Sequence, residues 1–171
     1  YFTGIGNNKR IVFYDTLIKT LDADEVEAVL AHELGHFKCK HISKQLVVST
    51  CITLAGFALL GWLKQQSWFF DGLGVSQINN ASALLLFILV SPVFSTFLQP
   101  IGSLFQRKFE FEADAFASTM TKPEYLIQAL VKLYRENAST LTPDPLYSSF
   151  HHSHPPAGVR IDHLKKLAGA T

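Results

Sequence analysis

The sequence predicts a mainly α-helical fold with a small β-strand at an edge and a hairpin of two apolar helices. Three observations lead to this prediction. Apolar residues recur at helical spacing in the polar parts of the chain, two long stretches carry no charge, and one short segment is rich in β-branched and aromatic residues. We expect residues 1–171 to form a single domain, because this length suits one hydrophobic core.

The strand and the first long helix are expected near the start of the chain. Residues 9–14, Lys-Arg-Ile-Val-Phe-Tyr, follow a Gly-Asn-Asn turn and have the composition of a strand. A helix should begin near Asp22, which can cap it, with Glu25 three residues later. Its apolar face at helical spacing comprises Val26, Val29, Leu30 and Leu34. The pattern continues without a strong helix breaker through His41.

Two uncharged stretches are predicted to cross a lipid bilayer as a helical hairpin. The first spans about residues 45–63, and a helix of this length, at about 1.5 Å per residue, nearly matches a hydrocarbon core of about 30 Å. The second spans about residues 83–105 and contains Pro92 and Pro100, which predict a kinked or broken span. Two buried helices of a soluble protein are the alternative. A chain of 171 residues has little to wrap around them, so we favour the membrane.

The remaining sequence is polar and is expected to be mostly helical. A helix should follow Arg107 through about Ser118, and an amphipathic helix should occupy residues 123–136. Residues 139–158 are rich in Pro, Ser and His and should form a loop, and residues 160–168 should form a short terminal helix.

Charge, cysteines and the first residues limit the classes of protein. The net charge of +1 gives no reason to expect a nucleic-acid partner. Cys39 and Cys51 do not make a disulfide framework, and we expect both to be small buried hydrophobes. The chain opens at Tyr1 without an initiator Met or a signal peptide, so we expect it to be a fragment of a larger protein.

The strongest chemical signal is His32-Glu33-Leu34-Gly35-His36. Side chains four residues apart lie on the same face of a helix, so His32 and His36 can bind one metal ion. Glu33 can reach a water on that ion, and Zn²⁺ lowers the pKa of such a water toward about 7. Two solvated histidines are the alternative. We favour zincin-like helices around one Zn²⁺ ion.

A catalytic zinc site needs a third protein ligand. Glu110 and Asp114 are four residues apart and share a helical face, whereas Glu112 points roughly the opposite way. We favour Glu110 as the ligand, with Glu112 as the fallback, and Asp114 as the acceptor for the free N–H of a ligand histidine. An ordinary acidic helix face is the alternative.

Histidines near the end of the chain form a third cluster. His151, His152 and His154 precede two prolines, and Arg160 follows. A histidine beside the metal could stabilise an oxyanion. The pattern leaves open which histidine would act, and a polar loop stiffened by the prolines is the alternative.

Together these blocks resemble the type I CAAX prenyl protease family, whose members are integral-membrane zinc metalloendopeptidases of the gluzincin type. The order and spacing of the blocks carry the resemblance, which extends over essentially the whole chain. The blocks are Tyr1–Gly4, Lys9–Leu17, His32–His36, the two apolar stretches, Phe109–Ala117 and Ser153–Pro156.

The resemblance implies a role for each of the residues at the metal site. His32, His36 and Glu110 match the family's zinc ligands. Glu33 matches the catalytic base, and Asp114 matches the acid that supports a ligand histidine. The cofactor is therefore expected to be one Zn²⁺ ion.

Two further site residues and the substrate also follow from the resemblance. His154 matches a histidine that contacts the substrate backbone or the transition state, and Arg160 matches a basic residue near the site. Eukaryotic members remove the C-terminal tripeptide of prenylated C-a-a-X proteins. We therefore expect a zinc-dependent membrane endopeptidase that cleaves near the C-terminus of CAAX-type substrates, prenylated or not.

Two other functions stay open. One is a quality-control zinc protease that cuts misfolded membrane proteins, and the other is a non-enzymatic membrane scaffold with a structural metal site. The expected partners are a protein or peptide substrate, the lipid bilayer and the upstream transmembrane part of the same protein, which matching family members possess.

Basic residues predict which side of the membrane carries the site. Lys38, Lys40 and Lys44 precede the first apolar stretch, and Arg107 and Lys108 follow the second. By the positive-inside rule, the catalytic side should face the cytoplasm.

Overall fold

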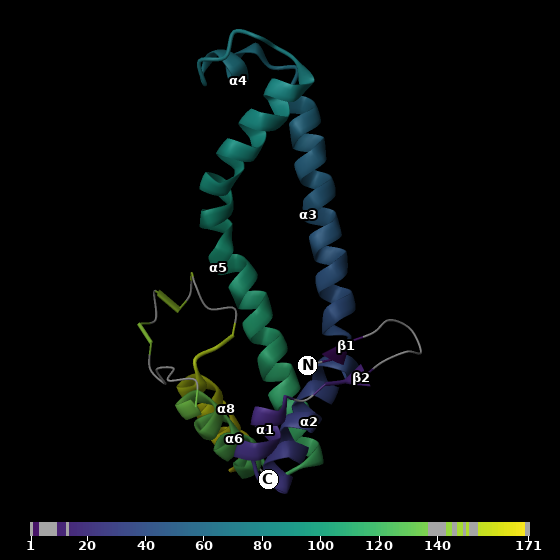
Figure 1. Ribbon diagram of the computed structural model, residues 1–171, viewed down its shortest axis with the longest axis vertical. Helices are drawn as coiled ribbons and strands as arrows, with labels where there is room; N and C mark the ends of the chain where they lie inside the picture. The colour runs from purple at the N-terminus through teal and green to yellow at the C-terminus, as the bar shows by residue number, and fades with distance from the viewer. Residues whose placement is uncertain are drawn as a thin grey trace. The chain divides into compact units, whose positions relative to one another are not determined.

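The computed structural model describes residues 2–3, 10–12, 14–136, 143–144, 147–148, 150 and 154–169. The chain forms two compact units. The first unit comprises Tyr1–His41 and Ile101–Thr171, and the second comprises Ile42–Pro100. Helices dominate both units (Figure 1), so the predicted mainly α fold is confirmed.

A two-stranded antiparallel sheet opens the chain. Strand β1 (Phe2–Thr3) pairs with strand β2 (Arg10–Ile11), with Phe2 opposite Ile11. In the described residues the strand predicted at 9–14 is thus limited to Arg10–Ile11. Tyr14 is already the N-cap of a short helix, α1 (Asp15–Thr20), which the sequence pattern did not reveal.

Helix α2 (Ala23–Lys38) begins where the capping residues predicted. Asp22 is its N-cap, and the Glu25 carboxylate accepts a hydrogen bond from the backbone N–H of Asp22 at 2.9 Å. The predicted end at His41 is wrong, because Lys40 has a φ of 56°. This left-handed conformation cannot continue a right-handed helix, so a new helix begins at His41.

The second unit contains most of the apolar sequence. It holds helix α3 (His41–Leu63) beyond its first residue, helix α4 (Ser67–Asp71) and the first half of helix α5 (Asn80–Met120). Its small core gathers where α3 ends and α5 begins, around Phe69, Phe70, Ala83 and Leu86. Both α3 and α5 are long and apolar enough to cross a membrane.

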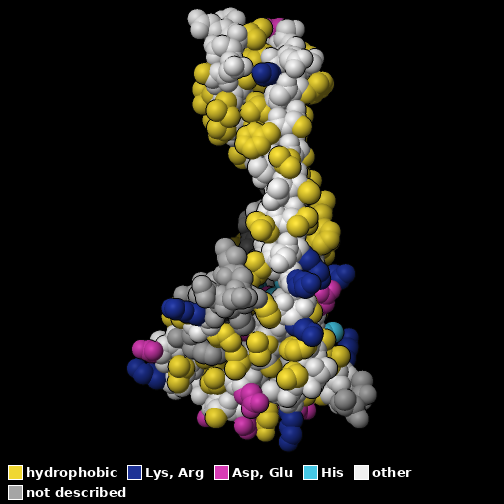
Figure 2. Space-filling model, turned by 90° about the vertical axis from the view of Figure 1, so that its right-hand side faces the viewer, with side chains coloured by type: hydrophobic (Ala, Val, Ile, Leu, Met, Phe, Trp, Pro, Cys, Tyr) yellow, Lys and Arg dark blue, Asp and Glu magenta, His cyan; other side chains and the backbone are white. Residues whose placement is uncertain are grey.

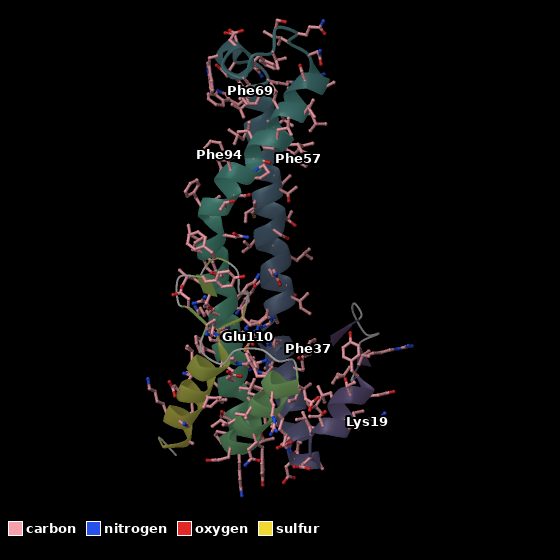
Figure 3. The ribbon with its side chains drawn as sticks, turned by 60° about the vertical axis from the view of Figure 1, so that its left-hand side comes forward. Lys19, Phe37, Phe57, Phe69, Phe94 and Glu110 are labelled. Atoms are coloured by element: carbon pink, nitrogen blue, oxygen red, sulfur yellow. The ribbon has the colours of Figure 1, made fainter. Side chains whose placement is uncertain are left out.

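Apolar side chains on α3 and α5 are largely exposed, as Figure 2 shows along the second unit. Phe57 on α3 and Phe94 on α5, both labelled in Figure 3, are each about two thirds exposed. Cys51 is exposed as well, so the expectation that it is buried is wrong, because it lies on α3 outside any core. Cys39 is half-buried. Helices of a soluble core would bury these residues.

Helix α5 runs without a break through Pro92 and Pro100, so the predicted break is wrong, whereas the predicted kink stays a prediction. Pro92 has no N–H to donate to the carbonyl of Ile88, one turn earlier. The hydroxyl of Ser91 donates to that carbonyl instead, at 3.4 Å. A local side chain therefore compensates for the missing backbone hydrogen bond.

The first unit has its own core of small and branched apolar residues. Helix α6 (Pro123–Glu136), which the sequence predicted, packs against both α2 and helix α8 (Ala157–Ala168), as Figure 1 shows. Helix α8 begins three residues before the predicted start at Arg160. Half of the predicted loop 139–158 lies outside the described residues. The core comprises Ala28, Ala31, Ala117, Leu126, Leu130 and Leu164.

Gly35 allows α2 to approach α5 closely. A Cβ atom on Gly35 would lie 2.9 Å from the Cα atom of Ala113 and 3.2 Å from the Cβ atom of Phe116. Only a residue without a side chain fits at this crossing. The crossing brings the two histidines of α2 next to the acidic turn of α5.

Candidate metal centre

Three helices of the first unit supply the residues of the candidate metal centre. His32 and His36 lie on α2, and Glu110 and Asp114 lie on α5. Arg160 lies on α8. Figure 3 shows Glu110 on the part of α5 that belongs to the first unit.

Three side chains converge with the geometry of a metal site. The Nε2 atoms of His32 and His36 are 3.1 Å apart, and each lies 3.5 Å from a carboxylate oxygen of Glu110. Ligand atoms held at about 2.0–2.1 Å from a tetrahedral ion are separated by about 3.3 Å. The observed spacings are close to this value, so these three residues could hold one metal ion.

The imidazole of His36 has a charge state that suits metal binding. Burial, followed by repulsion from His32, lowers the pKa of His36 to about 4. The ring is therefore neutral at pH 7 and keeps a lone pair for a metal. His32 behaves differently. Burial opposes its charged form, but the hydrogen bonds with Asp114 and Glu110 act in the other direction and its pKa is raised.

Asp114 fixes the orientation of His32. Its Oδ1 atom lies 2.9 Å from the Nδ1 atom of His32, and the residue is fully buried. An ionised carboxylate only accepts hydrogen bonds, so Nδ1 carries the proton in this contact. The Nε2 atom that faces Glu110 and His36 is then left to bind a metal.

Arg160 connects the two acidic residues of α5. Its Nε atom donates to Asp114 at 2.9 Å, its Nη2 atom donates to the other oxygen of Asp114 at 2.5 Å, and its Nη1 atom lies 3.0 Å from Glu110. Arg160 is 8% exposed. A buried guanidinium thus holds both carboxylates in a fixed geometry.

His154 reaches the same cluster from the segment before α8. Its Nδ1 atom lies 2.9 Å from Oε1 of Glu110, while 67% of its side chain is exposed. The hydrogen bond with Glu110 raises the pKa of His154, although partial burial opposes the charged form. His151 and His152 lie outside the described residues, so they cannot be compared with His154.

The other two acidic candidates, Glu33 and Glu112, lie on different helices, α2 and α5. Glu33 is half-buried on α2 beside His32, and its part in catalysis stays a prediction. Glu112, the fallback ligand, lies away from the His32–His36 pair, with Oε2 2.9 Å from Nε2 of His41. Sequence spacing missed His41, because the turn at Lys40 sets its position.

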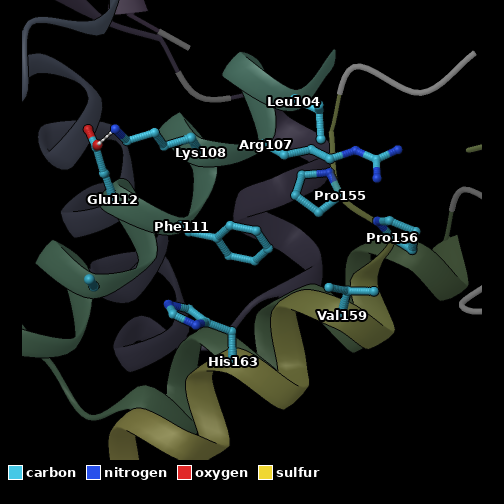
Figure 4. A pocket seen from close by; sticks show the side chains of 10 residues that line it. Leu104, Arg107, Lys108, Phe111, Glu112, Pro155, Pro156, Val159 and His163 are labelled. Atoms are coloured by element: carbon cyan, nitrogen blue, oxygen red, sulfur yellow. Dashed lines mark ion pairs between the residues drawn. The ribbon is translucent and has the colours of Figure 1, made fainter. Parts of the chain in front are cut away.

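An apolar pocket of about 550 Å³ lies in the first unit (Figure 4). The rings of Phe111 and His163, which both line it, are in contact, with centroids 4.9 Å apart and planes tilted by 58°. Pro155 and Pro156, next to His154, contribute to its wall. The pocket lining does not include the three converging residues, so pocket and metal centre are distinct features of the first unit.

Comparison with known families agrees with these features. The chain matches the model of Peptidase family M48 over residues 1–168 and therefore belongs to that family. The resemblance to the CAAX prenyl proteases, predicted from the motifs, is confirmed by relatives of that name.

The relatives with this name narrow the class of protein within Peptidase family M48. The chain is 36% identical over 166 residues to a CAAX prenyl protease 1 homolog of Oryza sativa subsp. japonica, covering 96% of this chain and 39% of that protein. It is 33% identical over 180 residues to CAAX prenyl protease 1 of Saccharomyces cerevisiae, covering 96% of this chain and 40% of that protein.

A solved structure matches the fold. The crystal structure of S. mikatae Ste24p superposes with a TM-score of 0.80 at 36% identity, covering 96% of this chain and 41% of the matched chain. The chain thus spans about two fifths of the length of the relatives it matches.

Proposed function

We propose that this chain carries the zinc-binding catalytic centre of a membrane endopeptidase that cleaves near the C-terminus of CAAX-type proteins. The observation that carries the proposal is the convergence of His32, His36 and Glu110 at distances suited to one tetrahedral ion. Membership of Peptidase family M48 and relatives named CAAX prenyl proteases support the reaction and the substrate.

The ligand set favours zinc among the common metals. Two imidazole nitrogens and one carboxylate are ligands that Zn²⁺ accepts, and three protein ligands leave a position for a reacting group. Zinc bound there would supply Lewis acidity to the scissile carbonyl and to the attacking water. His32, His36 and Glu110 would hold the ion.

The protein's own groups would carry the proton transfers. Glu33, half-buried beside His32 on α2, would take a proton from the attacking water and pass it to the leaving amine. His154, largely exposed next to Glu110, would donate a hydrogen bond to the oxyanion that forms during attack. Arg160 would contribute through Asp114 and Glu110, which it holds in place.

The length and the exposed apolar side chains of α3 and α5 support a location of this protein in a membrane. Their exposed apolar surfaces need a non-aqueous environment, and both helices are long enough to span a bilayer. Lys44 precedes the first apolar stretch, and Arg107 and Lys108 follow the second, which favours the cytoplasm for the catalytic side. The rest of the full-length protein would supply further transmembrane segments.

The test uses the full-length protein in detergent, because the chain spans only part of its relatives. We expect one zinc per chain and cleavage of a prenylated CAAX peptide. Glu33→Gln should keep the zinc and lower kcat by about 10²–10⁴-fold, since it removes the general base. Full residual activity of Glu33→Gln would exclude the proposed role of Glu33.

The same assay separates the competing functions. Preference for an unfolded membrane protein over the prenylated peptide would favour quality control. A zinc-free parent protein, or a zinc-loaded parent without peptidase activity on either substrate, would overturn the proposed enzyme.

A further inference from the structure

His41 lies between the metal centre and Glu112 in the first unit. It is 3% exposed. Its Nδ1 atom lies 3.0 Å from Nδ1 of His36, and its Nε2 atom lies 2.9 Å from Oε2 of Glu112. Three side chains thus form a continuous hydrogen-bonded series from Glu112 to the far side of the His36 ring.

The donor and acceptor groups of these three side chains determine where each proton lies. An ionised carboxylate only accepts hydrogen bonds, so Nε2 of His41 must donate to Glu112. In a neutral His41 ring, Nδ1 is then an acceptor, and Nδ1 of His36 must donate to it. The proton of His36 is therefore on Nδ1, and its Nε2 lone pair faces His32 and Glu110.

Packing holds the series in position. The His41 ring stacks on Phe109 with centroids 4.4 Å apart and planes 15° from parallel. Lys108 lies 3.8 Å from the other carboxylate oxygen of Glu112, one helical turn away on α5. The stacking on Phe109 thus restricts rotation of the His41 ring.

We propose that His41 and Glu112 are positioning residues that set the tautomer and orientation of His36. They serve His36 as Asp114 serves His32, so each ligand histidine has its own acceptor on the side away from the metal. This proposal rests on the proposed function of the centre as a zinc site. It assigns Glu112 a role other than ligand to that ion.

A second metal ion is the competing use of the same residues. Cys39, His41 and Glu112 also bring three donor atoms within 4.8 Å of one another. Such an ion would take a nitrogen of His41 and would therefore replace its contact with His36 or with Glu112. The two arrangements predict different zinc contents, namely one or two ions per chain.

The test compares two pairs of variants in the full-length protein. Glu112→Gln keeps an acceptor for His41, whereas Glu112→Leu removes it. His41→Asn can still accept a hydrogen bond from His36, whereas His41→Leu cannot. Glu27→Leu, at an exposed carboxylate on α2, is the matched control.

Zinc affinity, measured by competition with a chromophoric chelator, is the main readout. We expect both leucine variants at positions 41 and 112 to bind zinc about 10–100-fold more weakly. Glu112→Gln, His41→Asn and the control should stay within about threefold of the parent, because the acceptor or the site is intact. The visible spectrum of the Co²⁺-substituted protein should shift in the leucine variants alone.

Each outcome decides the proposal. Unchanged zinc affinity in a folded Glu112→Leu protein would overturn it, as would Glu112→Gln binding zinc as weakly as Glu112→Leu. Two zinc ions per parent chain would replace the positioning role by a second metal site. If the leucine variants do not fold, zinc binding by Glu112→Gln or His41→Asn that is more than about tenfold weaker than in the parent would still overturn the proposal. A parent without zinc would instead refute the proposed function on which it rests.

Discussion

Gly35 and Ala113 bring the two halves of the candidate metal centre together. The Cα atom of Ala113 lies 2.9 Å from where a Cβ atom on Gly35 would be placed. Ala113 separates Glu112 from Asp114 on α5, and Gly35 immediately precedes His36 on α2. The separation between the ligand helices is therefore set by the smallest side chains available.

Gly35→Ala should destabilise the protein and disturb the site. The added methyl group forces α2 away from α5, and overpacking of this kind costs about 1–3 kcal/mol. We expect a lower unfolding midpoint and weaker zinc binding, measured by thermal unfolding and chelator competition. Gly56→Ala on α3, where a Cβ atom meets nothing within 4 Å, is the control and should keep the zinc affinity of the parent, with an unfolding midpoint that is no lower.

Glu110→Ala should abolish zinc retention, because two imidazoles alone do not make a catalytic zinc site. Metal analysis of the purified full-length protein checks this. Glu124→Ala, at an exposed position on α6, should keep the zinc content of the parent. A Glu110→Ala protein with full zinc would mean that another residue is the third ligand.

Arg160→Leu should destabilise the protein strongly. It leaves the buried Asp114 without its cationic partner, and breaking a buried ion pair typically costs about 3–5 kcal/mol. Arg160→Lys restores the charge but not the two-pronged contact, so it should rescue only part of the loss. Denaturant unfolding measures the effect. Arg135→Leu, at an exposed arginine on α6, is the control. A fully stable Arg160→Lys variant would argue against the two-pronged contact.

Removal of zinc should lower the unfolding midpoint of the full-length protein. An ion that binds only the folded state stabilises it by about 4 kcal/mol when free zinc exceeds Kd a thousandfold. Calorimetry with and without chelator tests this, and added zinc should restore the midpoint. In His36→Ala the chelator should have little effect. If the chelator left the parent unchanged, the ion would make no contribution to stability.

The sequence predicted those structural features that depend on residues close to one another along the chain. Asp22 and Glu25 predicted the start of α2, because capping involves residues three apart. The uncharged stretches predicted α3 and α5, because burial in a bilayer requires composition and length alone. Their spacing of four residues placed Glu110 and Asp114 on one face of a helix.

Features that depend on contacts between helices could not be predicted. Spacing left Glu110 and Glu112 as alternatives, and the crossing of α2 with α5 decides which of them faces His32 and His36. Lys40 gave no signal of its left-handed backbone, since glycine and asparagine are the residues that usually mark one. The contacts of His41 with His36 and Glu112 therefore became visible only in three dimensions.

The backbone of Lys40 restricts how this stretch of sequence can vary during evolution. A left-handed conformation costs a residue with a side chain about 1–2 kcal/mol, and glycine avoids most of this cost. Homologous chains that preserve the His36–His41 contact should therefore tolerate glycine or asparagine at this site and avoid valine, isoleucine and threonine. A histidine directly after such a permissive residue, five places beyond the second motif histidine, would then identify distant homologues that share the arrangement.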